Sequence, residues 1–342
     1  MTRSLLVAAC CCAAMLLPSC NRSRAPVSRQ STAMNTYIAV TIYDRDVSES
    51  RAQALIDTAF AEIRRVEGFA TDYEDTSEVG RINAASGRSP LRASDELIGL
   101  IRRGLAYGEQ SSGKLDISIG ALVKEWDFLG AHPHALTRQQ VDSVLPHVNF
   151  RNVGIKGSEV YLPDSLMRLD LGSYGKGYAI DRASEKLLAA GLREFIVDIG
   201  GKLRVQYEGS HMLDSTVARI LIRHPRKEGE YLGSFSMGTG AVSTSGDYER
   251  YFMENGVRYH HLLDPATGYP ARGVVAVTVV TGDAITGDAV STIAFLLGRE
   301  KGMAFIRNMP GIDGMMTYED GDSLASDITP GLARRFTRGS VQ

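Results

Sequence analysis

Apolar side chains recur at helical spacing in some stretches of the chain and form β-branched or aromatic runs in others. The helical spacing predicts helices over residues 51–66, 94–111, 137–145, 287–297 and 300–307. The runs predict strands over residues 36–43, 219–222, 235–244, 274–280 and 315–318, and a hairpin over 149–163. Helices and strands are mixed without strict alternation, which favours an α+β fold over a doubly wound parallel one.

Residues 168–205 form the most informative of these patterns. A short apolar run around Asp170 predicts a strand, and a turn containing Gly172, Gly175 and Gly177 follows it. An amphipathic helix to Gly191 and a strand over 195–197 complete the unit. Such a unit can present backbone N–H groups and a helix N-terminus to an anion, so we expect the diphosphate of a nucleotide-like cofactor there. An ordinary turn that needs glycine for its geometry explains these residues equally well.

Two polar residues of the predicted helix 287–297 could hold a metal ion. Asp288 and Thr292 are four positions apart, which places both on one helix face. A carboxylate and a hydroxyl are hard oxygen ligands that suit Mg²⁺ better than zinc. The competing interpretation is an acid in the first helical turn beside a hydroxyl that faces the core, and these two residues alone favour it.

Two other segments carry groups that could take part in catalysis. His260 and His261 precede a turn over residues 264–268, and on a strand they point to opposite sides, so at most one faces a site. That histidine could be a general base or a phosphate contact, although a structural role is the simpler interpretation. Small hydroxyl residues over 243–245 suit close approach to a ligand or an ordinary strand end. The segment contains no G-x-S-x-G motif, which argues against a serine hydrolase.

Composition narrows the class of protein. The 342 residues are 44% hydrophobic and 23% charged, values typical of a soluble globular chain with a sizeable core. The formal net charge of -2, without a basic stripe, makes nucleic acid an unexpected partner. No repeat or second linker is evident, so residues 34–342 are expected to form one catalytic domain.

The N-terminus resembles a bacterial lipoprotein signal. Arg3 precedes an apolar stretch that is too short to span a bilayer, and Leu17-Pro18-Ser19-Cys20 resembles a lipobox. The resemblance implies a signal peptide over 1–19, lipidation of Cys20 and attachment by acyl chains at the extracytoplasmic face of a membrane. Residues 20–33 are expected to be a flexible tether. The other cysteines, Cys10, Cys11 and Cys12, would leave with the signal peptide, which excludes thiol chemistry in the mature domain.

Five segments, taken together and in order, resemble one family. They are TDYEDTSEVGRIN (71–83), DLGSYGKGYAIDRA (170–183), AVSTSGDYERYF (241–252), HHLLDPATGYP (260–270) and TGDAVSTIAFLLG (286–298). The chain is similar to the ApbE-type FAD:protein FMN transferases over nearly all of residues 34–342. The resemblance implies a T-fold-like α+β architecture with mixed or antiparallel sheets. It also implies Mg²⁺-dependent cleavage of the FAD diphosphate. FMN would pass to a threonine or serine of a partner, such as a membrane redox subunit, and AMP would leave.

The resemblance also implies roles for individual residues. The metal ligands would be Asp288, Thr292, the backbone carbonyl of Gly175 and, through its backbone, Ser291. The FAD contacts would be Met34, Tyr73, Leu115, Asp116, Ile117, Gly172, Tyr178 and Leu262. The catalytic groups would be Lys176, Asp288 and His261. Our hypothesis is that His261 deprotonates the incoming hydroxyl, or otherwise that Asp288 assists while bound to metal.

The chain departs from the family pattern in three places. The usual residues are replaced by Ser173-Tyr174-Gly175, Met34-Asn35-Thr36 and Gly80, and no contact is expected from Gly80.

The function has three alternatives. They are the flavin transferase, an FAD diphosphatase that yields FMN and AMP, and a flavin-binding lipoprotein without turnover. Asp288 and Thr292 argue against the third, because storage needs no metal at a diphosphate.

Overall fold

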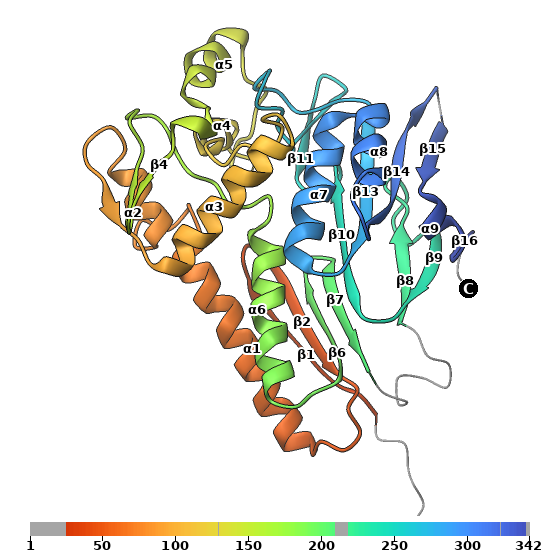
Figure 1. The fold of residues 1–342 in the computed structure, drawn as a ribbon. Helices are drawn as coiled ribbons and strands as arrows, with labels where there is room; N and C mark the ends of the chain where they lie inside the picture. The colour runs from red at the N-terminus through yellow and green to blue at the C-terminus, as the bar shows by residue number, and fades with distance from the viewer. Residues whose placement is uncertain (1–24, 129, 209–217, 322, 340–342) are drawn as a thin grey trace, which may run out of the picture.

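The central element of the fold is an antiparallel eight-stranded sheet. The structure, a computed structural model, describes residues 25–128, 130–208, 218–321 and 323–339. The sheet has the strand order β1-β2-β6-β7-β10-β13-β14-β15, and every neighbouring pair is antiparallel (Figure 1). Its strands are β1 (Val27–Ala33), β2 (Thr36–Ile42), β6 (Glu194–Ile199), β7 (Lys202–Tyr207), β10 (Gly240–Gly246), β13 (Val274–Thr281), β14 (Asp313–Asp320) and β15 (Ser323–Ile328).

Helices cover one face of this sheet, and a smaller sheet covers part of the other (Figure 1). The helices are α1 (Glu49–Ala70), α6 (Gly175–Ala189), α7 (Ala284–Leu297) and α8 (Arg299–Arg307). The smaller sheet contains β8 (Ala218–Arg223), β9 (Tyr231–Met237) and β16 (Phe336–Arg338), and α9 (Pro330–Ala333) lies beside it. In β13, Val279 packs toward α7 while Val280 packs toward β8 and β9. Burial from both sides explains why the whole β13 run is apolar.

The remaining elements extend from the helical side. They are α2 (Glu78–Ala84), α3 (Asp95–Gln110), α4 (Gly120–Trp126), α5 (Arg138–Val144), 3₁₀ turns at Leu145–His147 and Phe150–Asn152, the small sheet of β3 (Leu91–Arg92), β5 (Glu159–Tyr161) and β4 (Gly154–Lys156), and the hairpin of β11 (Tyr251–Glu254) and β12 (Val257–His260). Trp126 of α4 stacks on Tyr259 of the hairpin and donates to the carbonyl of Gly268 at 2.9 Å. These contacts fix the segment that carries the two adjacent histidines.

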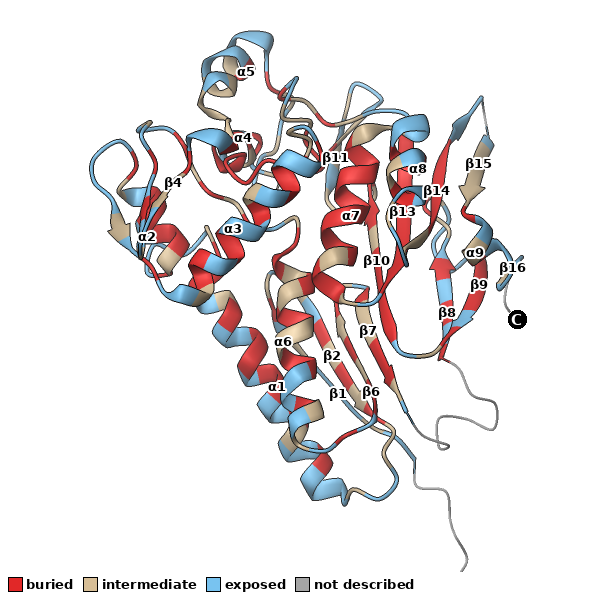
Figure 2. Cartoon of the chain, in the orientation of Figure 1, coloured by how far each residue is buried: buried red, intermediate tan, exposed pale blue. Residues whose placement is uncertain are grey.

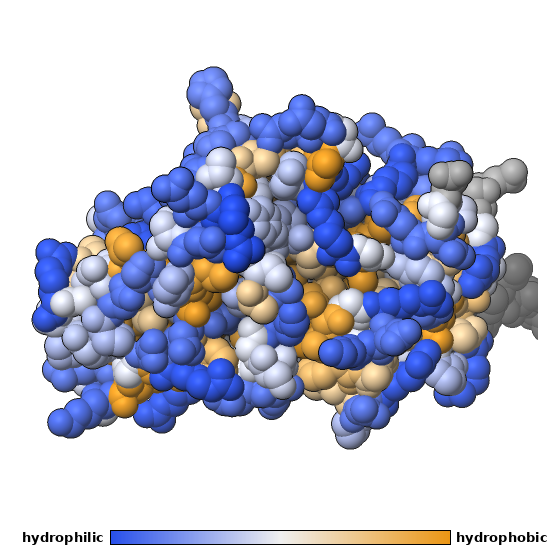
Figure 3. Space-filling model, turned by 90° about the horizontal axis from the view of Figure 1, so that it is seen from above, coloured by the Kyte–Doolittle hydropathy of each residue, from blue (hydrophilic) through white to orange (hydrophobic). Residues whose placement is uncertain are grey.

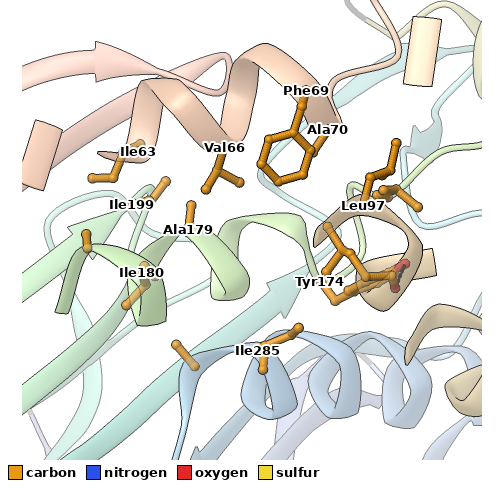
Figure 4. Close-up of a cluster of buried hydrophobic side chains, with 14 of the residues drawn as sticks. Ile63, Val66, Phe69, Ala70, Leu97, Tyr174, Ala179, Ile180, Ile199 and Ile285 are labelled. Carbon is orange, nitrogen blue, oxygen red and sulfur yellow. Dashed lines mark hydrogen bonds between the residues drawn. The ribbon is translucent and has the colours of Figure 1, made fainter. Parts of the chain in front are cut away.

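The core between α1, α6 and α7 positions the candidate site. In Figure 4, Ile63 and Val66 of α1 point toward Ala179 of α6, and Ile285 of α7 lies on the other side of α6. Each fully buried valine or isoleucine side chain contributes about 1.5–3 kcal/mol to the free energy of unfolding relative to an exposed one. Helix α7 is buried on almost every side, as Figure 2 shows, so its polar residues are enclosed rather than solvated. By contrast, the face seen in Figure 3 is mainly polar, with separate hydrophobic patches.

The predicted α+β class is confirmed, and most predicted elements are present. The helices predicted over 94–111 and 137–145 begin after side-chain caps at Ser94 and Thr137, and the predicted hairpin turns at residues 157–158. The strand predicted around Asp170 is wrong, because this segment makes only an isolated bridge between Ile119 and Arg168. The single strand predicted over 235–244 is also wrong, since glycines at 238 and 240 divide it into β9 and β10, which belong to different sheets.

The predicted flexible tether is wrong for its second half. Residues 27–33 form the edge strand β1, which pairs with β2 through a two-residue turn at Met34 and Asn35. Both turn residues have positive φ, the geometry of a tight hairpin. An edge strand with polar side chains lacks the apolar period by which strands are recognised. Residues 1–24, with the predicted signal peptide and Cys20, lie outside the described residues. Within the described ranges, no helix has the length and apolar character needed to cross a membrane.

Candidate functional site

The candidate site lies where α6 and α7 approach each other closely. A Cβ on Gly177 would lie 2.3 Å from the carbonyl oxygen of Ala284, so only glycine fits there. Asp181 of α6 caps α7, because its two carboxylate oxygens accept the N–H groups of Ala284 and Ile285, both at 2.9 Å. At position 177, therefore, packing of the two helices accounts for the glycine.

Substitution of Gly177 by alanine is expected to lower the free energy of unfolding by about 1–3 kcal/mol, because the methyl group overpacks the contact between the helices. Urea unfolding of the variant and the parent measures this difference. Gly68→Ala is the matched control, since its Cβ meets nothing within 4 Å in the exposed part of α1. Helix propensity predicts a small stabilisation for the control. Equal midpoints for Gly177→Ala and the parent would refute the steric explanation.

Three amides of the glycine turn already have hydrogen-bond acceptors within the chain. The N–H groups of Gly172, Gly175 and Gly177 donate to Asp170 Oδ1, the Leu171 carbonyl and Asp288 Oδ2, respectively. Two of these amides therefore donate to carboxylates of the chain itself, and the predicted contact of the turn with a diphosphate stays a prediction. The backbone of Gly175 nevertheless has space beside it, because a Cβ there would meet nothing closer than a methyl carbon of Met34 at 4.0 Å. The side of Gly175 on which a Cβ would lie is therefore not tightly packed.

Asp288 is the buried carboxylate of the site, with 1% of its surface exposed. Its Oδ2 accepts the Gly177 N–H at 2.9 Å, and its Oδ1 lies 2.9 Å from Lys202 Nζ. The ammonium lies off the direction of a hydrogen bond to Oδ1, so this oxygen has charge compensation without an accepted bond. Helix α7 begins at Ala284 with Asp283 as its N-cap, three residues before the predicted start. Asp288 is consequently in the second turn, and its interpretation as a first-turn acid is wrong.

Hydroxyl groups surround the main chain of Asp288. Ser291 and Thr292 donate to the Asp288 carbonyl oxygen at 3.0 and 3.1 Å, and Ser245 Oγ of β10 lies 2.9 and 3.2 Å from these two hydroxyls. The structure thus brings together the predicted ligands on α7. Among the described residues, no group of three His, Cys, Asp or Glu could hold a metal. A cation here would need hydroxyl and carbonyl oxygens beside one carboxylate, which suits Mg²⁺.

Positive side chains lie around the buried carboxylate of Asp288. An ammonium already lies beside the buried Asp288 Oδ1, and that oxygen retains an unused lone pair. Burial alone would lower the pKa of Lys202, but the contact with Asp288 and the negative charges of Asp288 and Glu249 together outweigh burial and raise the pKa. Lys176, whose Nζ donates to the Gly172 carbonyl at 3.2 Å, has its pKa lowered by burial, with Lys202 and Arg250 adding to the effect and Asp288 opposing it.

The two histidines have different environments. His260 is 2% exposed, its Nε2–H donates to the Ala271 carbonyl at 2.8 Å, and its Nδ1 accepts the Leu262 N–H at 3.3 Å. It also lines a cavity of about 400 Å³ that neither His261 nor Asp288 lines. His261 is half-buried, with Nδ1 3.4 Å from the Arg250 carbonyl oxygen. Its pKa is held well below the usual range by burial and then by the positive charges of Arg250 and Lys176.

His260 is expected to destabilise the fold on acidification. Burial lowers its pKa from 6.5 to about 4. The unfolded chain therefore binds a proton near pH 6.5 while the folded chain does not, and stability falls between pH 6.5 and about 4. The full effect is about 3 kcal/mol. Urea unfolding at pH 7 and pH 4 should show a smaller loss for His260→Gln than for the parent. An identical loss in both proteins would contradict this role.

Two predicted flavin contacts meet at one carboxylate. Glu67 Oε1 accepts the backbone N–H of Met34 at 2.6 Å and the hydroxyl of Tyr73 at 2.7 Å. Burial and the bond to Glu67 raise the pKa of Tyr73, so the phenol remains neutral. Glu67 thus joins Tyr73, which is 50% exposed, to the turn that lies beside Gly175.

The other predicted FAD contacts are engaged within the protein. Asp116 accepts the backbone N–H and hydroxyl of Ser118 and the N–H of Phe150. These three hydrogen bonds satisfy the buried carboxylate. Leu115, Ile117 and Leu262 are core residues, and Tyr178 donates to Glu96 at 2.7 Å. The Ile117 carbonyl accepts the Asp170 N–H at 2.8 Å, which joins residues 115–117 to the glycine turn.

Sequence reasoning missed Lys202, Arg250 and Glu67. Lys202 begins β7 with an inward side chain, and its sequence position contains no signal of that. Arg250 follows the small hydroxyl residues in the segment 241–252, where a basic residue beside a candidate ligand site could have been noticed. Ser245 belongs to the hydroxyl residues 243–245 that the sequence singles out, but its contact with Ser291 and Thr292 of α7 has no signal in the sequence.

Comparison with known proteins shows the family of the chain. The model of the ApbE family matches residues 34–316. The chain is 31% identical over 313 residues to a FAD:protein FMN transferase of Klebsiella pneumoniae strain 342, covering 87% of this chain and 91% of the relative. It is 29% identical over 310 residues to one of Treponema pallidum strain Nichols, covering 86% and 84%.

Solved structures agree as well. The ApbE protein of Thermotoga maritima has a TM-score of 0.82 at 27% identity, covering 91% of this chain and 99% of that one. The apo flavinyl transferase ApbE of Pseudomonas stutzeri has a TM-score of 0.79 at 26% identity, covering 92% and 98%. The fold and the sequence therefore lead to the same family.

Proposed function

The chain belongs to the ApbE family, and we propose that it transfers FMN from FAD to a threonine or serine of a partner protein and releases AMP. The observation that carries the proposal is the buried Asp288, held between the Gly177 amide and the Lys202 ammonium at the junction of α6 and α7. A buried carboxylate surrounded by Lys176, Lys202 and Arg250 suits a bound diphosphate and its counter-ion better than it suits a structural role.

The residues present fit a magnesium ion. Asp288 Oδ1, the Thr292 hydroxyl, the Gly175 carbonyl and the backbone of Ser291 would hold it. When bound, Mg²⁺ supplies positive charge that offsets the negative charge of the diphosphate. Lys176 adds a second positive charge beside the turn, where its Nζ donates to the Gly172 carbonyl. The charges of Lys176 on α6 and of the ion held by Asp288 on α7 would thus orient the diphosphate.

His261 is proposed to act as the general base. Its Nδ1 lies near the Arg250 carbonyl, which favours the tautomer with the proton on Nδ1 and a free lone pair on Nε2. Burial and then the nearby positive charges keep the ring neutral. In the transfer, the acceptor oxygen bonds to the FMN phosphorus, the bond from that phosphorus to the bridging oxygen breaks, and AMP leaves with that oxygen. The hydroxyl proton passes to Nε2 of His261.

FAD hydrolysis is the second candidate function. His261 is half-buried, so water can approach the same base in place of an acceptor hydroxyl. Hydrolysis would give free FMN and AMP, while transfer attaches FMN to the acceptor. The two reactions share the site and differ only in the nucleophile.

We also propose the cellular setting of the reaction. The acceptor is a membrane redox subunit, and the enzyme is held at the extracytoplasmic face by acyl chains on Cys20, as the lipobox resemblance implies. Mass spectrometry of the intact mature protein from membranes tests the anchor. A chain that begins at residue 20 and carries acyl groups is expected, and an unmodified N-terminus would contradict it.

Product analysis tests the proposed function. The domain is incubated with FAD, Mg²⁺ and a protein that carries an acceptor threonine, and the masses of the acceptor and the free nucleotides are measured. A mass gain of one FMN, lost with EDTA, is expected. Free FMN and AMP without a gain would favour the diphosphatase, and intact FAD with several acceptors would contradict both activities.

A further inference from the structure

Lys202 places a positive charge at the centre of the candidate site. Its Nζ lies 2.9 Å from Asp288 Oδ1 and donates to the Thr244 carbonyl oxygen at 2.9 Å. The side chains of Lys202 and Asp288 are only 5% and 1% exposed. Water cannot solvate either charge well at this depth, so each one compensates the other.

A metal at Asp288 needs an oxygen that the ammonium already faces. Gly177 N–H occupies Oδ2, which leaves Oδ1 as the oxygen available to a cation. Lys202 Nζ is within 2.9 Å of this same oxygen. Two cations cannot share one oxygen at contact distance without strong repulsion in a buried site. Lys202 and a divalent cation therefore compete for Asp288 Oδ1.

The local geometry allows the ammonium to move away. Its contact with Oδ1 lacks hydrogen-bond direction, whereas its bond to the Thr244 carbonyl is formed. The Thr244 carbonyl gives Lys202 a partner after displacement, and Ser245, the next residue, contacts the hydroxyls of Ser291 and Thr292. The strand that retains the lysine thus also contacts the other candidate ligands.

We propose that Lys202 is a resident counter-cation of the metal site, which stabilises the Asp288 carboxylate in the metal-free protein and is displaced from Oδ1 by the divalent cation. This inference rests on the metal site of the proposed function. It makes Lys202 a positioning residue with two opposed effects. The lysine keeps the empty site folded, and it weakens the binding of metal to the free protein.

Manganese binding to Lys202→Met tests the proposal. Methionine keeps the length of the buried stem and removes the charge. Mn²⁺ is titrated into the parent and the variant without nucleotide, and free Mn²⁺ is measured by electron paramagnetic resonance. The variant is expected to bind Mn²⁺ about tenfold more tightly. Lys227→Met is the matched control, because Lys227 pairs with Glu230 on the surface, and its affinity should equal that of the parent.

Thermal unfolding supplies the second readout. Without metal, Lys202→Met should melt at a lower temperature than the parent, because Asp288 becomes a buried charge without a partner. Saturating Mn²⁺ should raise its melting temperature by more than that of the parent. If the methionine variant does not fold, Lys202→Gln replaces it, with a smaller change expected in the same direction.

The outcomes separate this proposal from the proposed function. Equal or weaker Mn²⁺ binding by the variant would overturn the competition, even if the parent transfers FMN. Weaker binding of ADP with unchanged Mn²⁺ affinity would instead make Lys202 a diphosphate contact and also overturn it. If neither protein binds Mn²⁺, the metal site and the competition both fail, while the product analysis still decides whether FMN is transferred.

Discussion

Replacing Asp288 by asparagine is expected to lower the rate of FMN transfer about a thousandfold or more. The amide can still accept the Gly177 N–H, but it is a poor ligand for Mg²⁺ and no longer balances the charge of Lys202. Loss of one group that stabilises the charge of a transition state typically costs a factor of about 100–1,000, and loss of a metal costs more. Initial rates with FAD and an acceptor protein measure the effect.

Stability is the confounding effect in that experiment. Asp288→Asn leaves the ammonium of Lys202 buried without a partner, and breaking a buried ion pair in this way costs about 3–5 kcal/mol. The double variant Asp288→Asn, Lys202→Met removes both charges and should recover most of the stability without recovering transfer. Recovery of transfer in the double variant would show that Asp288 acts through folding alone.

Removing the imidazole of His261 is expected to reduce transfer by a factor of about 100–10,000, the usual contribution of a general base. His261→Ala should bind FAD with little change, because its ring contacts the Arg250 carbonyl rather than the glycine turn. His260→Gln is the matched control, since His260 is a buried structural neighbour, and it should retain activity at pH 7. Equal losses in both variants would assign the effect to the hairpin instead of the base.

The pH dependence follows from the lowered pKa of His261. A base must be neutral to accept a proton, and the folded protein keeps this ring neutral below the usual pKa of 6.5. Transfer by the parent should therefore stay constant as the pH falls from 8 to 6.5, and decrease only at a lower pH. A decrease centred at pH 6.5 would show an unperturbed histidine and would contradict the influence of burial and of the charges of Arg250 and Lys176 on its pKa.

Much of the fold could be predicted from local pattern. The helices at 49–70 and 95–110 and the buried strand at 274–281 have apolar spacing that packing requires. The errors arose where tertiary context decides. The largely polar segment β1 is a strand because it pairs with β2. The run that contains β9 and β10 forms two strands because its two halves belong to different sheets.

The site was predicted in composition but not in geometry. Asp288, Ser291 and Thr292 do gather, and His261 is the histidine beside Lys176 and Arg250. At the glycine turn, the sequence did not indicate that Gly177 is required for helix packing and that its amide donates to Asp288. Lys202 could not be predicted, because its partner is 86 positions away and the contact depends on how β7 packs against α7.

The central claim is that the diphosphate and its metal lie between the turn at Gly175 and the second turn of α7. Anomalous diffraction from crystals grown with Mn²⁺ and ADP tests it most directly. We predict one manganese peak in contact with Asp288 and Thr292, with the phosphates beside Lys176. A peak elsewhere, or bound ADP away from Gly175 with no manganese at Asp288, would contradict the account.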